Sequence, residues 1–174
     1  MFVSAFMSWI FLTIFFTYAG ETAADPGNDK GKIRISAKTL VSDSEAKYAE
    51  FTGNVRAIQG NTVITSDRLR VFYKAVSGNK QKPVSGEQAI EKIVAEGNVK
   101  IKFDNKVAET EHAVYTTKDK VLVLSGPGSK LISGNNSISG SKITLYRAEG
   151  RIKFESNSDK PVEAVLYPGE NGIK

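Results

Sequence analysis

The sequence contains no cysteine, a single histidine (His112) and a single tryptophan (Trp9) among its 174 residues. The absence of cysteine excludes disulfide scaffolds, thiolate zinc sites, cysteine nucleophiles and iron–sulfur clusters. One histidine disfavours catalytic and metal sites that need histidine pairs or a serine–histidine couple. Nucleophile-elbow, zinc-protease and phosphate-cradling motifs are also missing. We therefore expect neither an enzyme nor a bound cofactor.

The remaining composition is that of an ordinary folded domain. Hydrophobic residues make up 40% of the chain and charged residues 25%, with a formal net charge of +5. This balance disfavours a disordered chain, and the length allows a packed core. A positive charge can indicate nucleic-acid binding, but no basic motif with interleaved aromatic residues accompanies it. We expect no nucleic-acid partner.

The first segment has the character of an export signal. Residues 1–20 carry no charge, and 15 of them are apolar. The apolar run over residues 2–16 is too short for a bilayer core of about 30 Å at about 1.5 Å per residue. We predict a signal peptide over residues 1–24, cleaved near 19 or 24, followed by one domain over 25–174 and a periplasmic location. The segment lacks the usual basic residues, so an uncleaved anchor is the alternative.

The rest of the chain is repetitive. A glycine within an apolar run is followed eight residues later by a turn residue, three times over: 53 to 61, 97 to 105 and 126 to 134. An apolar–x–small–x–x–apolar pattern also begins at residues 35, 64 and 138, with a looser copy at 107. The spacing predicts repeats of about 29 residues. A Gly-, Lys- and Ser-rich stretch over 74–88 lengthens one interval and indicates an inserted loop.

Each repeat has the alternation of a β-strand. Apolar side chains occupy every second position around Gly53, which indicates a bulge inside a strand. The alternation changes parity between Ile64 and Leu69, which predicts a bulge or corner at residues 66–67. We therefore predict an all-β fold of V-shaped layers: a sandwich, a jelly roll or a solenoid. Its inner faces carry small apolar side chains, so a groove could accept acyl chains, and its open edges invite strand addition.

Five motifs in order resemble the periplasmic lipopolysaccharide-transport protein A family. The resemblance extends from Ile33 to Pro168. The motifs are FTGNVRAIQG at 51–60, ITSDRL at 64–69, LSG at 124–126, ISGSKIT at 138–144 and VEAVLYP at 162–168.

The resemblance implies a twisted antiparallel β-jellyroll of two facing sheets whose interior binds the acyl chains of lipid A, the lipid part of lipopolysaccharide. It also implies head-to-tail stacking of copies between a bitopic inner-membrane component and an outer-membrane insertion barrel, without catalysis. The bitopic component itself, with residues 1–20 as its anchor, is one alternative. A polysaccharide-binding solenoid is a distant one, because no tryptophan follows residue 20.

Candidate lipid-binding residues follow from position and alternation. Two of them begin the first strand, where family members line the groove, and the others are predicted to point inward from later layers; all could equally be ordinary core. They are Ile33, Ile35, Val55, Val99, Ile101, Phe103, Tyr115, Val123 and Leu131.

Charged residues supply the remaining candidates. Basic side chains could neutralise the phosphates of lipid A, or could form a solvated surface. Asp67 and Glu111 each fall fourteen residues after a repeat glycine, which favours a corner role over catalysis or calcium binding. His112 is out of phase with the apolar positions, so we expect it to be exposed. The basic candidates are Lys30, Lys32, Arg34, Lys74, Lys80 and Lys82.

Overall fold

A computed structural model describes residues 32–74, 90–157 and 160–168 of the chain. Within these ranges the fold consists of strands alone, and none of the described residues forms a helix that could cross a membrane. The predicted signal peptide over 1–24, Lys30, Lys80 and Lys82 lie outside the described residues, as does the predicted loop beyond Lys74. The strands are β1 (Arg34–Ser36), β2 (Thr39–Asp43), β3 (Tyr48–Gln59), β4 (Thr62–Tyr73), β5 (Ile90–Phe103), β6 (Lys106–Thr116), β7 (Val121–Ser133), β8 (Asn136–Tyr146), β9 (Arg151–Glu155) and β10 (Glu163–Val165).

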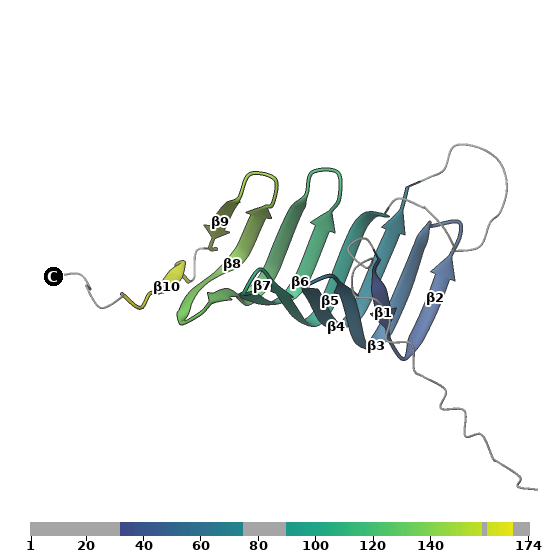
Figure 1. Ribbon diagram of the computed structural model, residues 1–174, viewed down its shortest axis with the longest axis horizontal. Coiled ribbons are helices and arrows are strands. Elements are labelled where there is room, and N and C mark those ends of the chain that lie inside the picture. Colours follow the sequence, from purple (N-terminus) through teal and green to yellow (C-terminus); the bar gives the residue numbers. More distant parts are fainter. Residues whose placement is uncertain (1–31, 75–89, 158–159, 169–174) are drawn as a thin grey trace, which may run out of the picture.

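The strands form one antiparallel, unclosed sheet of ten strands (Figure 1). From β3 to β8 each strand pairs with its neighbour in the chain. At one end, β1 and β2 pair with different halves of β3, and at the other end β9 and β10 pair with different halves of β8. The all-β prediction is confirmed, and the two facing layers belong to one continuous hydrogen-bonded sheet.

A line of β-bulges crosses the sheet and divides every long strand in two. The pairing register shifts after Thr52 in β3, after Thr65 in β4, after Glu96 in β5, after Glu109 in β6 and after Ser125 in β7. We call the halves that extend from β2 to β9 the β2–β9 arm, and the halves that extend from β1 to β10 the β1–β10 arm. The line of bulges is the vertex of the predicted V-shaped layers, and it confirms the expected irregularities at Gly53 and at residues 66–67.

The sequence at the vertex explains why the strands bend there. Gly97 and Asn98 are consecutive left-handed residues with φ of +74° and +48°. Gly and Asn adopt this conformation at the lowest cost. A Cβ on Gly97 would lie 2.5 Å from Asp67 Oδ2, and Asn98 Nδ2 donates a hydrogen bond of 2.8 Å to that oxygen. Glu111 packs against Gly126 in the same way. The predicted corner role of both carboxylates is confirmed.

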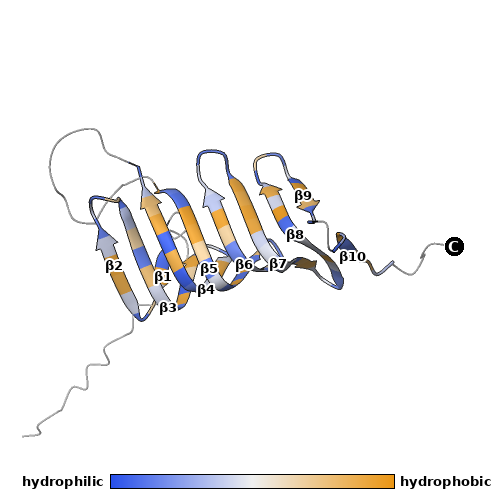
Figure 2. Cartoon of the chain, turned by 180° about the vertical axis from the view of Figure 1, so that it is seen from behind, coloured by the Kyte–Doolittle hydropathy of each residue, from blue (hydrophilic) through white to orange (hydrophobic). Residues whose placement is uncertain are grey.

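The core lies between the two arms. Buried apolar side chains of both arms, 0–7% exposed, form one contiguous cluster. Apolar and polar positions alternate along the strands, as the orange and blue bands of Figure 2 show. Because opposite positions pair across neighbouring strands, the inward residues form rows that cross the whole sheet. The inner row of the β1–β10 arm is Ile35, Ala57, Ile64, Ile101, Ala108, Leu131, Ile138 and Ala164.

The β2–β9 arm has a matching inner row. It begins at Leu40 on β2 and ends at Phe154 on β9. The row is poorly covered at its β2 end, where Leu40 is 58% exposed, whereas Leu69 and Leu124 within the row are 1% and 0% exposed and Phe154 packs against the core. The row consists of Leu40, Phe51, Leu69, Ala95, Ala113, Leu124, Ile143 and Phe154.

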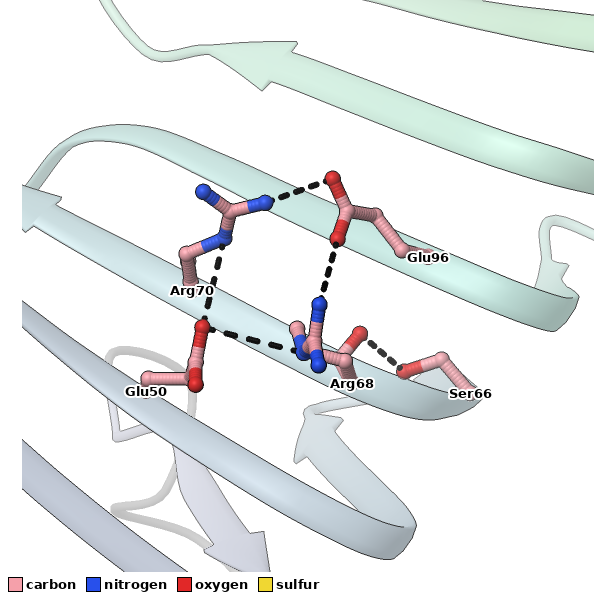
Figure 3. Close-up of polar contacts among 5 residues, drawn as sticks. All are labelled: Glu50, Ser66, Arg68, Arg70 and Glu96. Atoms are coloured by element: carbon pink, nitrogen blue, oxygen red, sulfur yellow. Dashed lines mark hydrogen bonds and ion pairs between the residues drawn. The ribbon is translucent and has the colours of Figure 1, made fainter.

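Charged residues on the outer face of the β2–β9 arm join β3, β4 and β5 (Figure 3). Arg70 Nη2 donates a hydrogen bond of 2.6 Å to Glu96 Oε1. Arg68 and Glu50 complete the network through ion pairs of 3.6–3.7 Å. The hydrogen bond from Arg70 is the main reason why the pKa of Glu96 lies below its ordinary value. The network joins three strands on the face that points away from the core.

Candidate functional site

The space between the arms is the site that the fold builds. Eight of the nine predicted lipid-binding residues lie on its inner face. Val55, Val99, Ile101, Phe103 and Leu131 are buried in the cluster, and Tyr115 packs against it. Ile33 and Ile35 lie at the β1 end, where they line a small apolar hollow. The structure thus brings these eight side chains to one largely apolar surface, which can hold hydrocarbon.

Val123 does not share this surface, so the predicted inward orientation is wrong. It pairs with Val114 and Thr144, and it alternates with Leu122 and Leu124, which point into the core. Residues 121–124 read Val-Leu-Val-Leu, so the apolar pattern alone does not define which side chains point inward. The pairing with β6 determines which side chains point inward, because the inward Tyr115 lies opposite Leu122 rather than Val123.

The hollow at the β1 end has a volume of about 40 Å³. It lies between the arms and is lined by Ile33 and Ile35 of one arm and by Leu69, Val71 and Ile93 of the other. Beyond it the interior is filled by the buried cluster. The groove is therefore open at the β1 end, next to the buried cluster.

The mouth of the groove, opposite the vertex, is formed by the turns at the tips of the arms. The β1–β10 arm ends in turns at residues 60–61, 104–105 and 134–135, and the β2–β9 arm in turns at 44–47, 117–120 and 147–150. An ion pair crosses the mouth: Arg147 Nη2 lies 3.4 Å from Asp104 Oδ2. The Arg147 guanidinium also lies over the ring of Phe103, 5.5 Å from its centroid.

Among the predicted basic candidates, those that the structure describes are not gathered at the groove. Lys32 precedes β1 and Arg34 begins it. Both are exposed, and Arg34 pairs with Ile58 on the outer face of the β1–β10 arm. Lys74 is exposed at the tip of β4 in the other arm. His112 is exposed, as expected. The described residues contain no group of three His, Cys, Asp or Glu that could hold a metal ion.

Arg147 is the functional candidate that the sequence reasoning missed. A signal for its partner was present in the repeat, because Asp104 stands in the Asp104-Asn105 turn where the related turns have Gly60 and Gly134. Arg147 itself is 43 residues away from Asp104. Which turn of the opposite arm would face Asp104 depends on the twist of the sheet, which no local pattern encodes.

Comparisons with known proteins agree with this architecture. A family described as LptA/(LptD N-terminal domain) LPS transport protein matches residues 34–151. An uncharacterized protein of Rhizobium meliloti (strain 1021) is 29% identical over 129 residues, covering 74% of this chain and 67% of the relative. An uncharacterized protein of Rickettsia prowazekii (strain Madrid E) is 28% identical over 123 residues, covering 70% and 78%.

A solved structure shares the fold. It is the crystal structure of LptH, the LptA-homologous periplasmic component of the lipopolysaccharide transport device of Pseudomonas aeruginosa. The TM-score is 0.65 at 17% identity, with 80% of this chain and 99% of that chain covered. The bent open sheet with an apolar interior is thus an LptA-like β-jellyroll. The chain belongs to the LptA/LptD N-terminal domain family of lipopolysaccharide (LPS) transport proteins.

Proposed function

We propose that the protein is a periplasmic lipopolysaccharide carrier that holds the acyl chains of lipid A between its two arms. The observation that carries the proposal is the pair of inner rows, whose members are apolar from one end of the sheet to the other. Residues 1–24 would act as its export signal. The similar LptH is described as a periplasmic component of a lipopolysaccharide transport device, which supports the location.

Acyl chains would enter by separating the arms. The hollow of about 40 Å³ is the starting point, and the buried cluster beyond it must give way for a chain to advance. Each methylene moved from water to this surface contributes about 0.8 kcal/mol. We assign the contacts to the eight inward residues: Ile33, Ile35, Val55, Val99, Ile101, Phe103, Tyr115 and Leu131.

Copies would join head to tail so that their grooves become continuous. Each end of the sheet offers two short edge strands, and edge strands pair readily with other chains. The inner rows end in Leu40 and Ile35 at one edge and in Phe154 and Ala164 at the other. Docking one edge on the other would extend both rows. The same edges would receive a bitopic inner-membrane component and an outer-membrane insertion barrel.

One observation favours a second candidate, the bitopic inner-membrane component of the same machinery. Residues 1–20 carry no basic residue, although signal peptides usually begin with one, so the segment could be retained as an anchor. Isolation of a chain that begins near Glu21 or Asp25 from the soluble periplasmic fraction would eliminate this alternative.

The test is lipid binding by the chain from Asp25 onward, with light scattering of the same samples. We expect saturable binding of lipid A that outcompetes a phospholipid, and oligomers that grow with protein concentration. Monomers at every concentration would argue against the bridge. Equal affinity for lipid A and phospholipid would argue against the carrier.

A further inference from the structure

The ion pair between Arg147 and Asp104 joins turns at the tips of the two arms. Asp104 belongs to the β5–β6 turn at the tip of the β1–β10 arm, and Arg147 begins the β8–β9 turn at the tip of the β2–β9 arm. The β6–β7 and β8–β9 turns stand next to each other at the top of Figure 1. The backbone N–H of Arg147 donates to the carbonyl of Lys120, at 3.0 Å, which ties these two turns together. The guanidinium therefore extends from a fixed backbone position across the mouth.

Asp104 occupies a position that the fold gives to glycine elsewhere. Gly60 and Gly134, its counterparts in the other two turns of this arm, have φ of +54° and +58°, and Asp104 has a φ of +44°. An L-residue with a side chain adopts this left-handed conformation at a cost. Arg147 also differs from the first residues of the turns at 44–47 and 117–120 of its arm, which are Ser44 and Thr117. Asp104 and Arg147 thus each differ from the residues at equivalent turn positions, and their side chains form an ion pair with each other.

The ion pair between Arg147 and Asp104 is weak enough for another anion to replace the carboxylate. The side chain of Arg147 is 38% exposed and that of Asp104 is 68% exposed, so water and salt weaken their attraction. The distance of 3.4 Å is long for a charge-assisted hydrogen bond. A phosphate group offers more charge and more acceptor oxygens than one carboxylate, and a guanidinium can bind it through two N–H groups at once. An anion with these properties would displace Asp104.

We propose that Arg147 binds a phosphate group of the lipid A headgroup at the mouth of the groove, and that Asp104 pairs with the Arg147 guanidinium in the lipid-free protein. This inference rests on the proposed function. Acyl chains between the arms lie against apolar side chains, and the strands close the groove at the vertex, so a charged headgroup must lie toward the mouth. The Arg147–Asp104 pair is then a latch between the arms that the ligand itself releases.

The test compares two ligands, diphosphoryl lipid A and lipid A from which both phosphates have been removed. Arg147→Gln should weaken binding of the diphosphoryl form about tenfold, the size expected for loss of one charged hydrogen bond. Asp104→Asn should strengthen it several-fold, because the competing carboxylate is gone. Neither variant should change the affinity for the dephosphorylated form.

Arg151→Gln is the matched control. Arg151 follows the same turn, pairs with Glu149 at 3.0 Å and stacks on Tyr146, which alternates with the inward Leu145. We expect unchanged binding of both ligands. Thermal unfolding of each variant verifies that the fold persists.

The outcomes separate the two proposals. If the unaltered protein binds neither ligand, the proposed carrier function fails. If it binds both and Arg147→Gln affects both equally or neither, the headgroup site alone is wrong. Equal shifts in affinity in the same direction for Arg147→Gln and Asp104→Asn would show a purely structural latch and overturn the proposal.

Inorganic phosphate alone should not saturate the protein at millimolar concentration. Saturation that Arg147→Gln abolishes while lipid binding stays intact would assign Arg147 to free phosphate instead.

Discussion

At the scale of single residues, the vertex depends on glycines that have almost no space around them. Gly53 and Gly97 both have positive φ, and each faces a side chain from the neighbouring strand or edge segment: Lys38 against Gly53, and Asp67 against Gly97. By contrast, a Cβ on Gly60, at the tip of a turn, would meet nothing within 4 Å. The two sites therefore separate the cost of a backbone conformation from the cost of crowding.

Gly97→Ala should destabilise the protein more than Gly60→Ala. The left-handed conformation costs each alanine about 1–2 kcal/mol, and the clash with Asp67 Oδ2 at 2.5 Å adds about 1–3 kcal/mol at Gly97. In an Asp67→Ala background the added cost of Gly97→Ala should fall to that of Gly60→Ala. Urea unfolding of the single and double variants measures this. Equal costs at both glycines would contradict the crowding.

Glu96 supplies a pH-dependent contribution to stability. Its pKa is lowered chiefly by the hydrogen bond from Arg70, so the folded state holds the carboxylate ionised to lower pH than the unfolded chain does. The stabilisation is therefore complete above the unfolded pKa of about 4.3 and disappears as the pH falls through the folded pKa. Glu96→Gln should cost about 1–3 kcal/mol at pH 7, and the difference should vanish at low pH.

Urea unfolding between pH 3 and pH 7 checks this, and Glu109→Gln is a suitable control. Glu109 pairs with Lys100 at 2.8 Å, but both side chains are nearly half exposed, so the loss should stay below about 1 kcal/mol. A larger loss for Glu109→Gln than for Glu96→Gln would reverse the expected ranking.

At the scale of elements, β1 is the strand on which lipid binding is most easily tested. Ile35 is half-buried, lines the hollow and belongs to the inner row, whereas Ser36 is exposed and points to the other side. Because β1 is a short edge strand, a charge there should leave the rest of the sheet folded. The two neighbours thus form a pair of adjacent sites on opposite faces of the same strand.

Ile35→Glu should lower the affinity for lipid A at least tenfold, because a carboxylate in an apolar groove loses its hydration without gaining a partner. Ser36→Glu should leave the affinity unchanged. Equilibrium binding together with circular dichroism would measure both effects. Unchanged binding by a folded Ile35→Glu variant would remove Ile35 from the groove.

The elements also show which features of the fold and of the candidate site can be predicted from the sequence. Alternation and repeat spacing predicted strands, the bulge at Gly53 and the parity change at residues 66–67, because these depend on neighbours along one strand. They failed at Val123, where four apolar residues in a row leave the inward face undefined until β6 is paired. They could not find Arg147, since its contact with Asp104 arises from the geometry of two arms.

At the scale of the whole molecule, the ends of the sheet determine assembly. Leu40 and Val41 are adjacent on the edge strand β2 and are 58% and 55% exposed, but only Leu40 continues an inner row. At the other end, Leu166 and Tyr167 are 65% and 64% exposed beyond β10. Apolar side chains therefore remain uncovered at both ends.

Leu40→Lys should suppress the expected growth of oligomers, because it places a charge where the inner rows of two copies would meet. Val41→Lys lies on the outer face opposite Glu50 and should have a much smaller effect. Light scattering over a range of concentrations distinguishes the two. Equal assembly by both variants would exclude docking through the inner row.

Pairing in chain order has a further consequence, for the rate of folding. All-β proteins usually fold slowly, because strands that are distant in the chain must come together, at a cost in chain entropy, before their favourable contacts form. Here each strand from β3 to β8 pairs with its immediate successor or predecessor. The sheet can therefore grow one hairpin at a time from any starting point, as solenoid repeats do. A low contact order predicts folding faster than is usual for a β-sandwich of this length.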